Sequence, residues 1–139
     1  MSRELIRRDI VTAVEAIRAN LVLPYPLVVE YDNVAVVDTK TQFDPFITVE
    51  IKYLSAEQAD LGNNPLRRQW GQINLAAVVP EGSGTAKANQ LLDWFIPRLG
   101  LRAFGSVRTH VVTDAPAKMH LGWVYYFVAV PFWADYPNS

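Results

Sequence analysis

The chain has 139 residues, of which 50% are hydrophobic and 12% aromatic, and its formal net charge is −1. This composition excludes a disordered chain, which needs low hydrophobicity and high charge, and argues against a dedicated nucleic-acid binder, which is usually basic. Cysteine is absent, so disulfides and thiolate metal sites are excluded. The first residues lack the apolar core of a signal peptide, and no apolar run reaches the ~20 residues that span a bilayer. We therefore expect one domain over residues 1–139 that has no contact with a membrane.

Residues Arg3–Leu21 have the spacing of an amphipathic helix. Their apolar residues recur at steps of three and four, which places on one face Ile6, Ile10, Val14, Ile17 and Leu21. Pro24 and Pro26 follow, and proline cannot continue a helix because it lacks the N–H donor. Leu27–Tyr31 then reads as a short strand, and Phe46–Leu54 alternates apolar and polar residues with the period of two that is typical of a half-buried strand.

The polar segment Ser55–Leu66 predicts a long loop, and loops of this length in compact domains are often functional. We expect its polar side chains to line a pore or meet a partner, namely Glu57, Asp60, Asn63 and Asn64. The next strand, Arg67–Val79, has an apolar face and a polar face. The polar face should meet solvent or a partner, and carries Arg68, Trp70, Gln72 and Asn74.

A second helix, Thr85–Leu99, has the clearest apolar stripe of the chain. Ser83 or Thr85 is expected to cap its start and Gly100 its end. Ser106–Val112 and Leu121–Phe132 read as the last two strands, the second of them apolar on both faces. The order α-β-β-β-α-β-β predicts an α+β fold in which two helices pack on a mixed, mostly antiparallel β-sheet.

No segment carries a specific catalytic or ligand-binding signature. Gly82-Ser83-Gly84 precedes a helix and could bind phosphate there, but the glycine and Lys-Ser/Thr spacing of a P-loop is missing. The two histidines, His110 and His120, would need a carboxylate such as Asp114 to form a metal site. We therefore predict no catalytic residue, no cofactor and no metal.

Arginine and tryptophan side chains are the candidates for a binding surface. Arg67, Arg68 and Trp70 could contact nucleic acid by phosphate pairing and base stacking. Both residue types are also enriched at protein interfaces, and the near-neutral net charge favours the protein partner. Trp133 and Tyr136 are further interface candidates, because aromatic area near the end of the chain is hard to bury.

Several stretches resemble the tail terminator proteins of long-tailed bacteriophages. The first is the N-terminal helix with the proline-bounded strand Leu27–Tyr31 that follows it, and the second is Phe46–Ile51, a strand that follows an Asp-Pro pair. The third is the strand Arg68–Leu75, which continues through the turn Pro80–Gly84 into the helix Thr85–Leu99. The last is Gly122–Phe132, which is followed by Ala134-Asp135. The order of these stretches around the two predicted helices is similar to that of the family over nearly the whole chain.

The resemblance implies a structural protein rather than an enzyme. Members form rings, generally hexameric, that bind the end of the tail tube, stop its polymerisation and present a surface to the head-completion protein. The implied location is the head-proximal end of the virion tail, assembled in the host cytoplasm, with only incidental contact to exiting DNA. Two alternatives stay open: a head–tail connector that contacts DNA through Arg67 and Arg68, and a small-ligand domain or hydrolase that uses Gly82-Ser83-Gly84 and His110.

Overall fold

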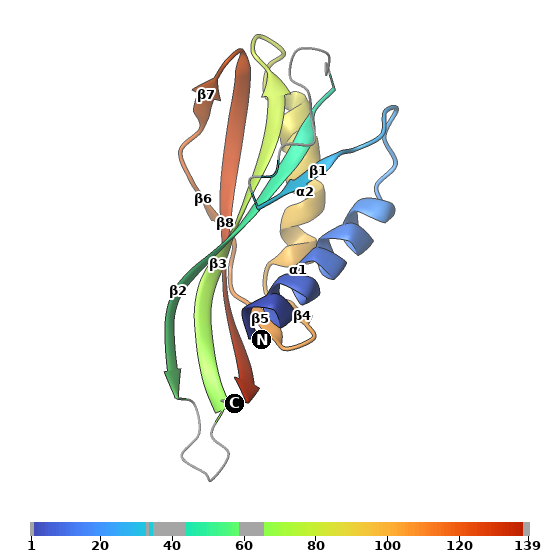
Figure 1. Cartoon of the computed structure of the whole chain (residues 1–139). Coiled ribbons are helices and arrows are strands. Elements are labelled where there is room, and N and C mark those ends of the chain that lie inside the picture. Colours follow the sequence, from blue (N-terminus) through green and yellow to red (C-terminus); the bar gives the residue numbers. More distant parts are fainter. Residues whose placement is uncertain (1, 33, 35–43, 59–65, 138–139) are drawn as a thin grey trace.

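The computed structural model describes residues 2–32, 34, 44–58 and 66–137 (Figure 1). Within these residues, two helices and eight strands follow one another in the order α1 Ser2–Ala19, β1 Val29–Tyr31, β2 Phe46–Gln58, β3 Leu66–Pro80, α2 Ala86–Leu99, β4 Ala103–Phe104, β5 Val107–Thr109, β6 Thr113–Asp114, β7 Lys118–His120 and β8 Trp123–Pro137. None of the described helices is long and apolar enough to cross a membrane.

The strands form one curled sheet in the order β1-β2-β3-β8-β5-β4, and β6 and β7 pair with the same edge of β8 as β5. The pair β1–β2 is parallel and the other pairs are antiparallel. The prediction of an α+β fold with a mixed, mostly antiparallel sheet is therefore confirmed. The predicted order is wrong after α2, where five strands replace two: Ser106–Val112 contains only the short β5, and two further strands precede β8.

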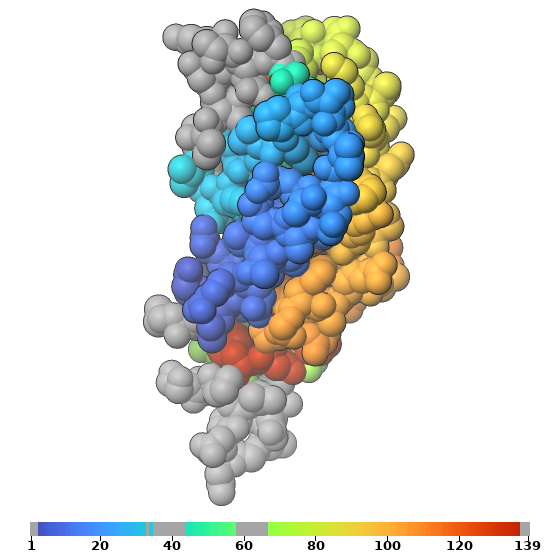
Figure 2. All heavy atoms as spheres, turned by 90° about the vertical axis from the view of Figure 1, so that its right-hand side faces the viewer, coloured from blue at the N-terminus to red at the C-terminus, as the bar shows by residue number. Residues whose placement is uncertain are grey.

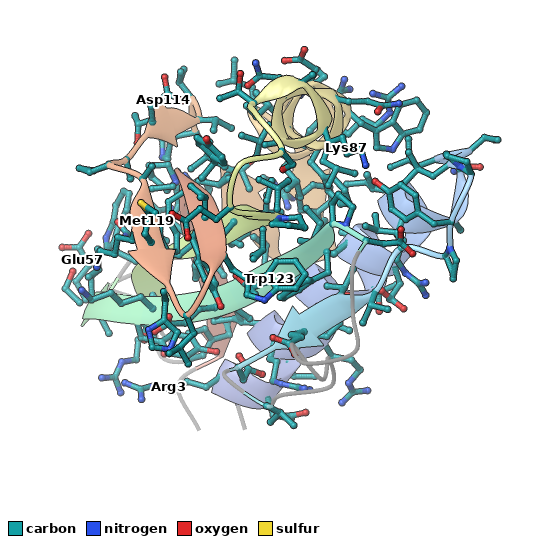
Figure 3. All side chains as sticks on the ribbon, turned by 90° about the horizontal axis from the view of Figure 1, so that it is seen from above. Arg3, Glu57, Lys87, Asp114, Met119 and Trp123 are labelled. Atoms are coloured by element: carbon teal, nitrogen blue, oxygen red, sulfur yellow. The ribbon has the colours of Figure 1, made fainter. Side chains whose placement is uncertain are left out.

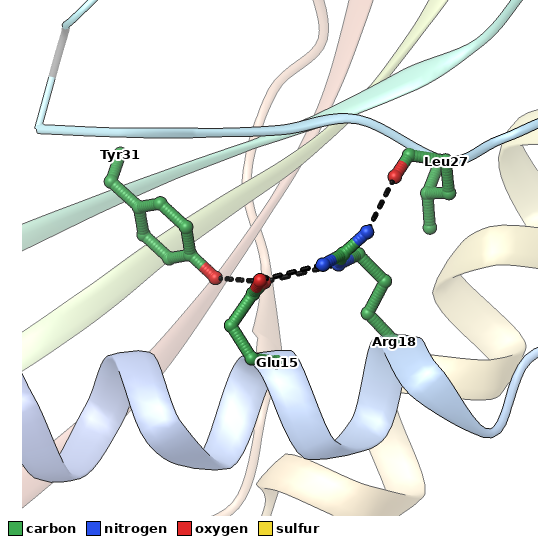
Figure 4. A network of polar contacts seen from close by, with 4 residues as sticks. All are labelled: Glu15, Arg18, Leu27 and Tyr31. Atoms are coloured by element: carbon green, nitrogen blue, oxygen red, sulfur yellow. Dashed lines mark hydrogen bonds and ion pairs between the residues drawn. The ribbon is translucent and has the colours of Figure 1, made fainter.

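Both helices pack on the same face of the sheet, where they build the main core (Figures 1 and 2). The predicted apolar stripes point inward, and the side chains that they bury include Ile6, Ile10, Val14, Leu91 and Phe95. A polar network fixes α1 to the strand above it (Figure 4): the Tyr31 hydroxyl donates to Glu15 Oε2 at 2.7 Å, and Arg18 bonds both Glu15 and the Leu27 carbonyl.

The opposite face of the sheet, here called the outer face, is covered by no described helix (Figure 1). At ~3.3 Å per residue the 13 to 15 residues of β2, β3 and β8 span about 43–50 Å. At 1.5 Å per residue the helices span only about 27 and 21 Å. The three strands are therefore much longer than the helical layer that packs on them, and they present an extended surface.

The predicted loop Ser55–Leu66 is wrong at both ends, because Ser55–Gln58 continues β2 and Leu66 begins β3. Glu57 consequently lies on a strand, paired with Arg68 of β3, and not on a loop. A register shift between Tyr53 and Ser55 interrupts the alternation, which is why the pattern of period two ended there. Asp60, Asn63 and Asn64 lie outside the described residues.

Strand β8 runs past its predicted end at Phe132 to Pro137, although Pro131 lies in its middle. Proline lacks a ladder donor and usually marks an edge. Here the Pro131 carbonyl accepts from His110 N at 2.8 Å, one residue after β5 ends at Thr109. Because the N–H and C=O of one residue point to the same side of a strand, the missing donor faces the end of β5 and the β3 side stays paired.

The expected side-chain caps of α2 are not formed. Thr85 occupies the first cap position but makes no side-chain bond to the helix, and the Ser83 hydroxyl bonds the Pro80 carbonyl at 2.6 Å instead. Gly100 does end the helix, in extended conformation, with its N–H on the Ile96 carbonyl. A β-carbon at Gly100 would lie 2.8 Å from Val112 Cγ2, so close packing is the reason for glycine there.

Candidate interface site

Residues from β2, β3, β8 and the end of β5 meet on the outer face, at the end of the sheet where the β2 and β3 strands run beyond α1. The group is called the tryptophan–arginine cluster and consists of Glu57, Arg68, Trp70, His110, Trp133 and Asp135. Strand register explains its formation, because Arg68 lies between Glu57 and Asp135 on the neighbouring strands, and Trp70 is the cross-strand partner of Trp133.

A bidentate ion pair joins Arg68 to Asp135 in the cluster. Arg68 Nε donates to Asp135 Oδ1 at 2.8 Å and Nη2 donates to Oδ2 at 2.9 Å, with side-chain exposures of 31% and 25%. Hydrogen bonding from Arg68 lowers the pKa of the Asp135 carboxyl, with a smaller lowering by the charge of Arg108, against an opposing effect of burial. The pair holds the guanidinium in a fixed plane, which a solvated arginine would not keep.

The fixed guanidinium lies against the aromatic rings of the cluster. Arg68 Cζ is 4.1 Å from the centroid of Trp133 and 5.9 Å from that of Trp70. The two indoles are 6.5 Å apart, and the His110 ring stacks on Trp70 at 6.3 Å with an angle of 14°. Trp70 Nε1 donates to Glu57 Oε1 at 3.3 Å. The result is a preorganised, half-exposed aromatic surface with one cation between two carboxylates.

The five predicted interface residues separate onto the two faces of the sheet. Arg68, Trp70 and Trp133 come together in the cluster, whereas Arg67 and Tyr136 pair with each other on the side of the helices. There Arg67 and Tyr136 line a shallow hollow with Arg3 of α1 and Gln69. Adjacent residues of a strand point to opposite faces, so Arg67 and Arg68 cannot form one cationic patch.

Sequence reasoning missed Asp135 and His110 as members of the cluster and gave Glu57 a different place. Only the alignment of β3 with β8 could have identified these residues. Once Arg68 is paired with Asp135, and Trp70 with Trp133, the residues that neighbour them on the outer face are determined. His120 lies at the end of β7, beside Trp123 rather than with His110. Within the described ranges no group of three or more histidine and acidic side chains could hold a metal ion.

The segments invoked for a small-ligand or hydrolase site do not meet. His110 lies opposite Pro131, whereas the turn Gly82–Gly84 follows Pro80, which pairs with Trp123. Positions 123 and 131 are eight residues apart on one strand, about 26 Å at ~3.3 Å per residue. These two groups therefore cannot act on one substrate.

Another hollow, ≈ 270 Å³ in volume, lies on the outer face. It brings together Glu30 of β1 and Glu50 of β2 with Asn74, Tyr125 and Phe127. Burial, and to a lesser degree the charge of Glu30, raises the pKa of the Tyr125 hydroxyl. The hollow is shallow and lined by strand residues alone, which makes it part of an extended surface rather than an enclosed ligand site.

Comparison with known proteins supports the fold described above. No protein-family model matches the chain, and no curated protein sequence matches it. One solved structure to which the chain is similar carries only a sequence code as its name; the two share 14% identity with a TM-score of 0.63, over 100% of this chain and 97% of that one. At this identity the likeness concerns the fold, and it shows that the arrangement of helices and strands described above exists as a whole in another protein.

Proposed function

We propose that this chain is a ring-forming tail terminator of a long-tailed bacteriophage, a structural protein that caps the tail tube. The proposal begins from the resemblance in the sequence. Its main structural support is the outer face of β2, β3 and β8, which is long, free of any described helix and rich in half-buried aromatic residues. Partly exposed aromatic side chains gathered on one face are typical of a surface that another protein covers.

The tryptophan–arginine cluster is the part of this face proposed to contact the tail tube protein. Arginine and tryptophan provide most of the binding energy in many protein interfaces. The Arg68–Asp135 pair also holds the arginine against the indole of Trp133 before any partner arrives, so little side-chain freedom is lost on binding. The head-completion protein would then meet the opposite side of the ring.

The rival functions have less support in the geometry. A connector that contacts DNA needs free cations on one surface, yet Arg68 is paired with Asp135 and Arg67 points to the other face. A hydrolase needs the turn Gly82–Gly84 and His110 in one place, and the strand register separates them.

The first test of the proposed function is the mass of the purified protein by light scattering over a wide range of concentrations. A closed ring should give about six times the 15.6 kDa of one chain. Tail length in a phage that depends on this chain is the second test: without it, tubes should grow beyond their normal length by electron microscopy. Normal tails without the chain would refute the proposal.

A paired set of variants tests the role of the cluster. Trp133→Ala should reduce binding to purified tail tubes at least tenfold while the circular dichroism spectrum stays unchanged, because the indole is half-exposed and its loss leaves the core intact. Lys87→Ala, which removes an exposed side chain at the start of α2 on another part of the surface (Figure 3), is the matched control and should bind normally. Equal binding by both variants would exclude the cluster.

A further inference from the structure

A hollow of ≈ 380 Å³ lies where the start of α1 meets the ends of β2, β3 and β8, on the helix-facing side of the sheet. Figure 1 shows the N-terminus of the chain beside the end of β8 there. Two of the residues that line the hollow are arginines, Arg3 and Arg67, and no described acidic residue lines it. The hollow therefore carries an excess of positive charge, although the net charge of the chain is −1.

Most described arginines have an acceptor within the chain. Those that hydrogen-bond a carboxylate or a backbone carbonyl are Arg7, Arg18, Arg68, Arg98, Arg102 and Arg108. Of the rest, Arg8 is exposed on α1, whereas Arg3 and Arg67 share the hollow, and the guanidinium of neither bonds a described residue. Two cations in one hollow repel each other, so contacts within the described chain do not offset this repulsion.

The fold holds both arginines in place. Arg3 Cζ lies 4.7 Å from the ring centroid of Tyr53 on β2, and the Tyr53 hydroxyl donates to the Arg3 carbonyl at 3.1 Å. Arg67 lies on β3, where it pairs with Tyr136 of β8. Groups that the fold already positions lose less conformational freedom when a ligand binds.

The wall of the hollow is polar where it is most buried. Gln69 is only 3% exposed, and its Nε2 donates to the carbonyls of Ser55 at 2.9 Å and Trp70 at 2.8 Å. Tyr136, which also lines the hollow, adds a hydroxyl that can donate a hydrogen bond. Donors consequently converge from α1, β3 and β8.

This arrangement of donors favours one class of anion. The planar guanidinium of arginine matches the oxygens of carboxylates and phosphates. A carboxylate has two oxygens in one plane, and a single guanidinium can bond both of them. A phosphoryl group has at least three acceptor oxygens that face different directions, so it can bond two guanidinium groups and a hydroxyl that come from different elements.

We propose that this hollow is a phosphoryl-binding site, in which Arg3 and Arg67 bind the phosphate oxygens and the Tyr136 hydroxyl donates to a further oxygen. The site goes beyond the proposed capping function and does not depend on it, because it lies on the opposite face from the tryptophan–arginine cluster. The phosphoryl group can belong to a free phosphate ester or to the backbone of a nucleic acid, and two probes distinguish these sources.

Calorimetric titration of the full chain with inorganic phosphate, near neutral pH and at low ionic strength, is the first test. Arg3→Gln and Arg67→Gln should each raise the dissociation constant about tenfold, because each removes a hydrogen bond between charged groups. Arg8→Gln is the matched control, since it removes the same charge from the exposed side of α1, and it should bind phosphate like the wild type. No binding by the wild type, or an equal loss in Arg8→Gln, overturns the proposal.

Two further measurements separate a binding role from a structural one. In phosphate-free buffer Arg67→Gln should have the same melting temperature as the wild type or a higher one, because it removes the repulsion with Arg3. Added phosphate should then raise the melting temperature of the wild type and not that of the variant, since a ligand of the native state stabilises it. A lower melting temperature of the variant without phosphate overturns the proposal, as does acetate that binds as tightly as phosphate.

A short DNA duplex is the second probe, and fluorescence anisotropy at several salt concentrations measures its binding. If the backbone of a nucleic acid supplies the phosphoryl group, the duplex should displace phosphate, and Arg67→Gln should lower the slope of log affinity against log salt by about one. A duplex that leaves phosphate bound assigns the site to a free phosphate ester. Both results support the phosphoryl site, and neither affects the test of ring formation.

Discussion

Gly71 is the position where one added methyl group should have the clearest effect on stability. It lies on β3 directly opposite Phe132 of β8, whose ring is fully buried. A β-carbon at Gly71 would lie 2.6 Å from Phe132 Cζ and 2.5 Å from the carbonyl oxygen of Lys52 on β2. Atoms this close must move, and neither a ring in a packed core nor the backbone of a paired strand moves easily.

Two opposing effects determine the result for Gly71→Ala. Alanine restricts the unfolded chain and would by itself stabilise the protein by about 0.4–1 kcal/mol. Overpacking of a core by one methyl costs about 1–3 kcal/mol. We expect overpacking to dominate, with a net loss of about 1–2 kcal/mol and, at about 3 °C per kcal/mol for a chain of this size, a melting temperature lower by about 3–6 °C.

Urea denaturation and calorimetry measure this change, and a second substitution shows where it comes from. In a Phe132→Leu background the ring atoms are gone, so Gly71→Ala should cost less, with a coupling of at least about 0.5 kcal/mol. An equal cost in both backgrounds would assign the whole effect to the Lys52 carbonyl. A gain in stability on Gly71→Ala would refute the packing argument, since only the entropic effect would remain.

Three further predictions concern polar contacts, each read by chemical or thermal denaturation. Because the pKa of Asp135 is lowered in the folded state, its carboxylate should stabilise the fold above about pH 4, and this stabilisation should be lost as the pH falls further. Asp135→Asn should make the free energy of unfolding less dependent on pH in this acidic range. An unchanged pH dependence would contradict the pairing with Arg68. The pKa of Tyr31 is raised by burial and by its bond to Glu15, so stability should fall above about pH 10; Tyr31→Phe should lose about 1 kcal/mol at pH 7 and show a shallower alkaline decline. Asp9→Ala, which removes the acceptor for the backbone N–H and hydroxyl of the β4–β5 turn, should cost about 1 kcal/mol, and a loss below 0.3 kcal/mol would assign that turn's stability to other contacts.

Periodicity in the sequence predicted the elements whose faces differ in polarity along their whole length. The stripe Ala88–Leu99 gave α2 to within one residue of its bounds, and the alternation from Arg67 gave both faces of β3 correctly. These patterns are local, and burial on one side produces them. The short strands after α2 have no such pattern, because two or three residues are too few for a period to show, and they exist only as partners of β8.

The candidate site was predicted in composition and not in arrangement. Arginine and tryptophan indicated an interface, and three of the five candidates do lie together. What assembles them is the register between β3 and β8, two strands whose paired residues are 43 or more positions apart in the chain, and no local pattern contains that alignment. The register also determined that Arg67 and Tyr136 face the helices, and that Glu57 is a strand residue beside Trp70.

The pairing of β3 with β8 has a consequence for how the chain reaches its native state. Both central strands of the sheet come from distant parts of the sequence, from Pro80 opposite Trp123 to Leu66 opposite Pro137. Pairing residues so far apart in the sequence closes a long loop, and the chain loses this conformational entropy before the contacts between the strands stabilise it. Folding is therefore slow. The hairpin of β2 and β3 can form early, but its apolar face stays open until β8 arrives. During synthesis that interval is the period in which the unfinished sheet is most exposed to pairing with other chains.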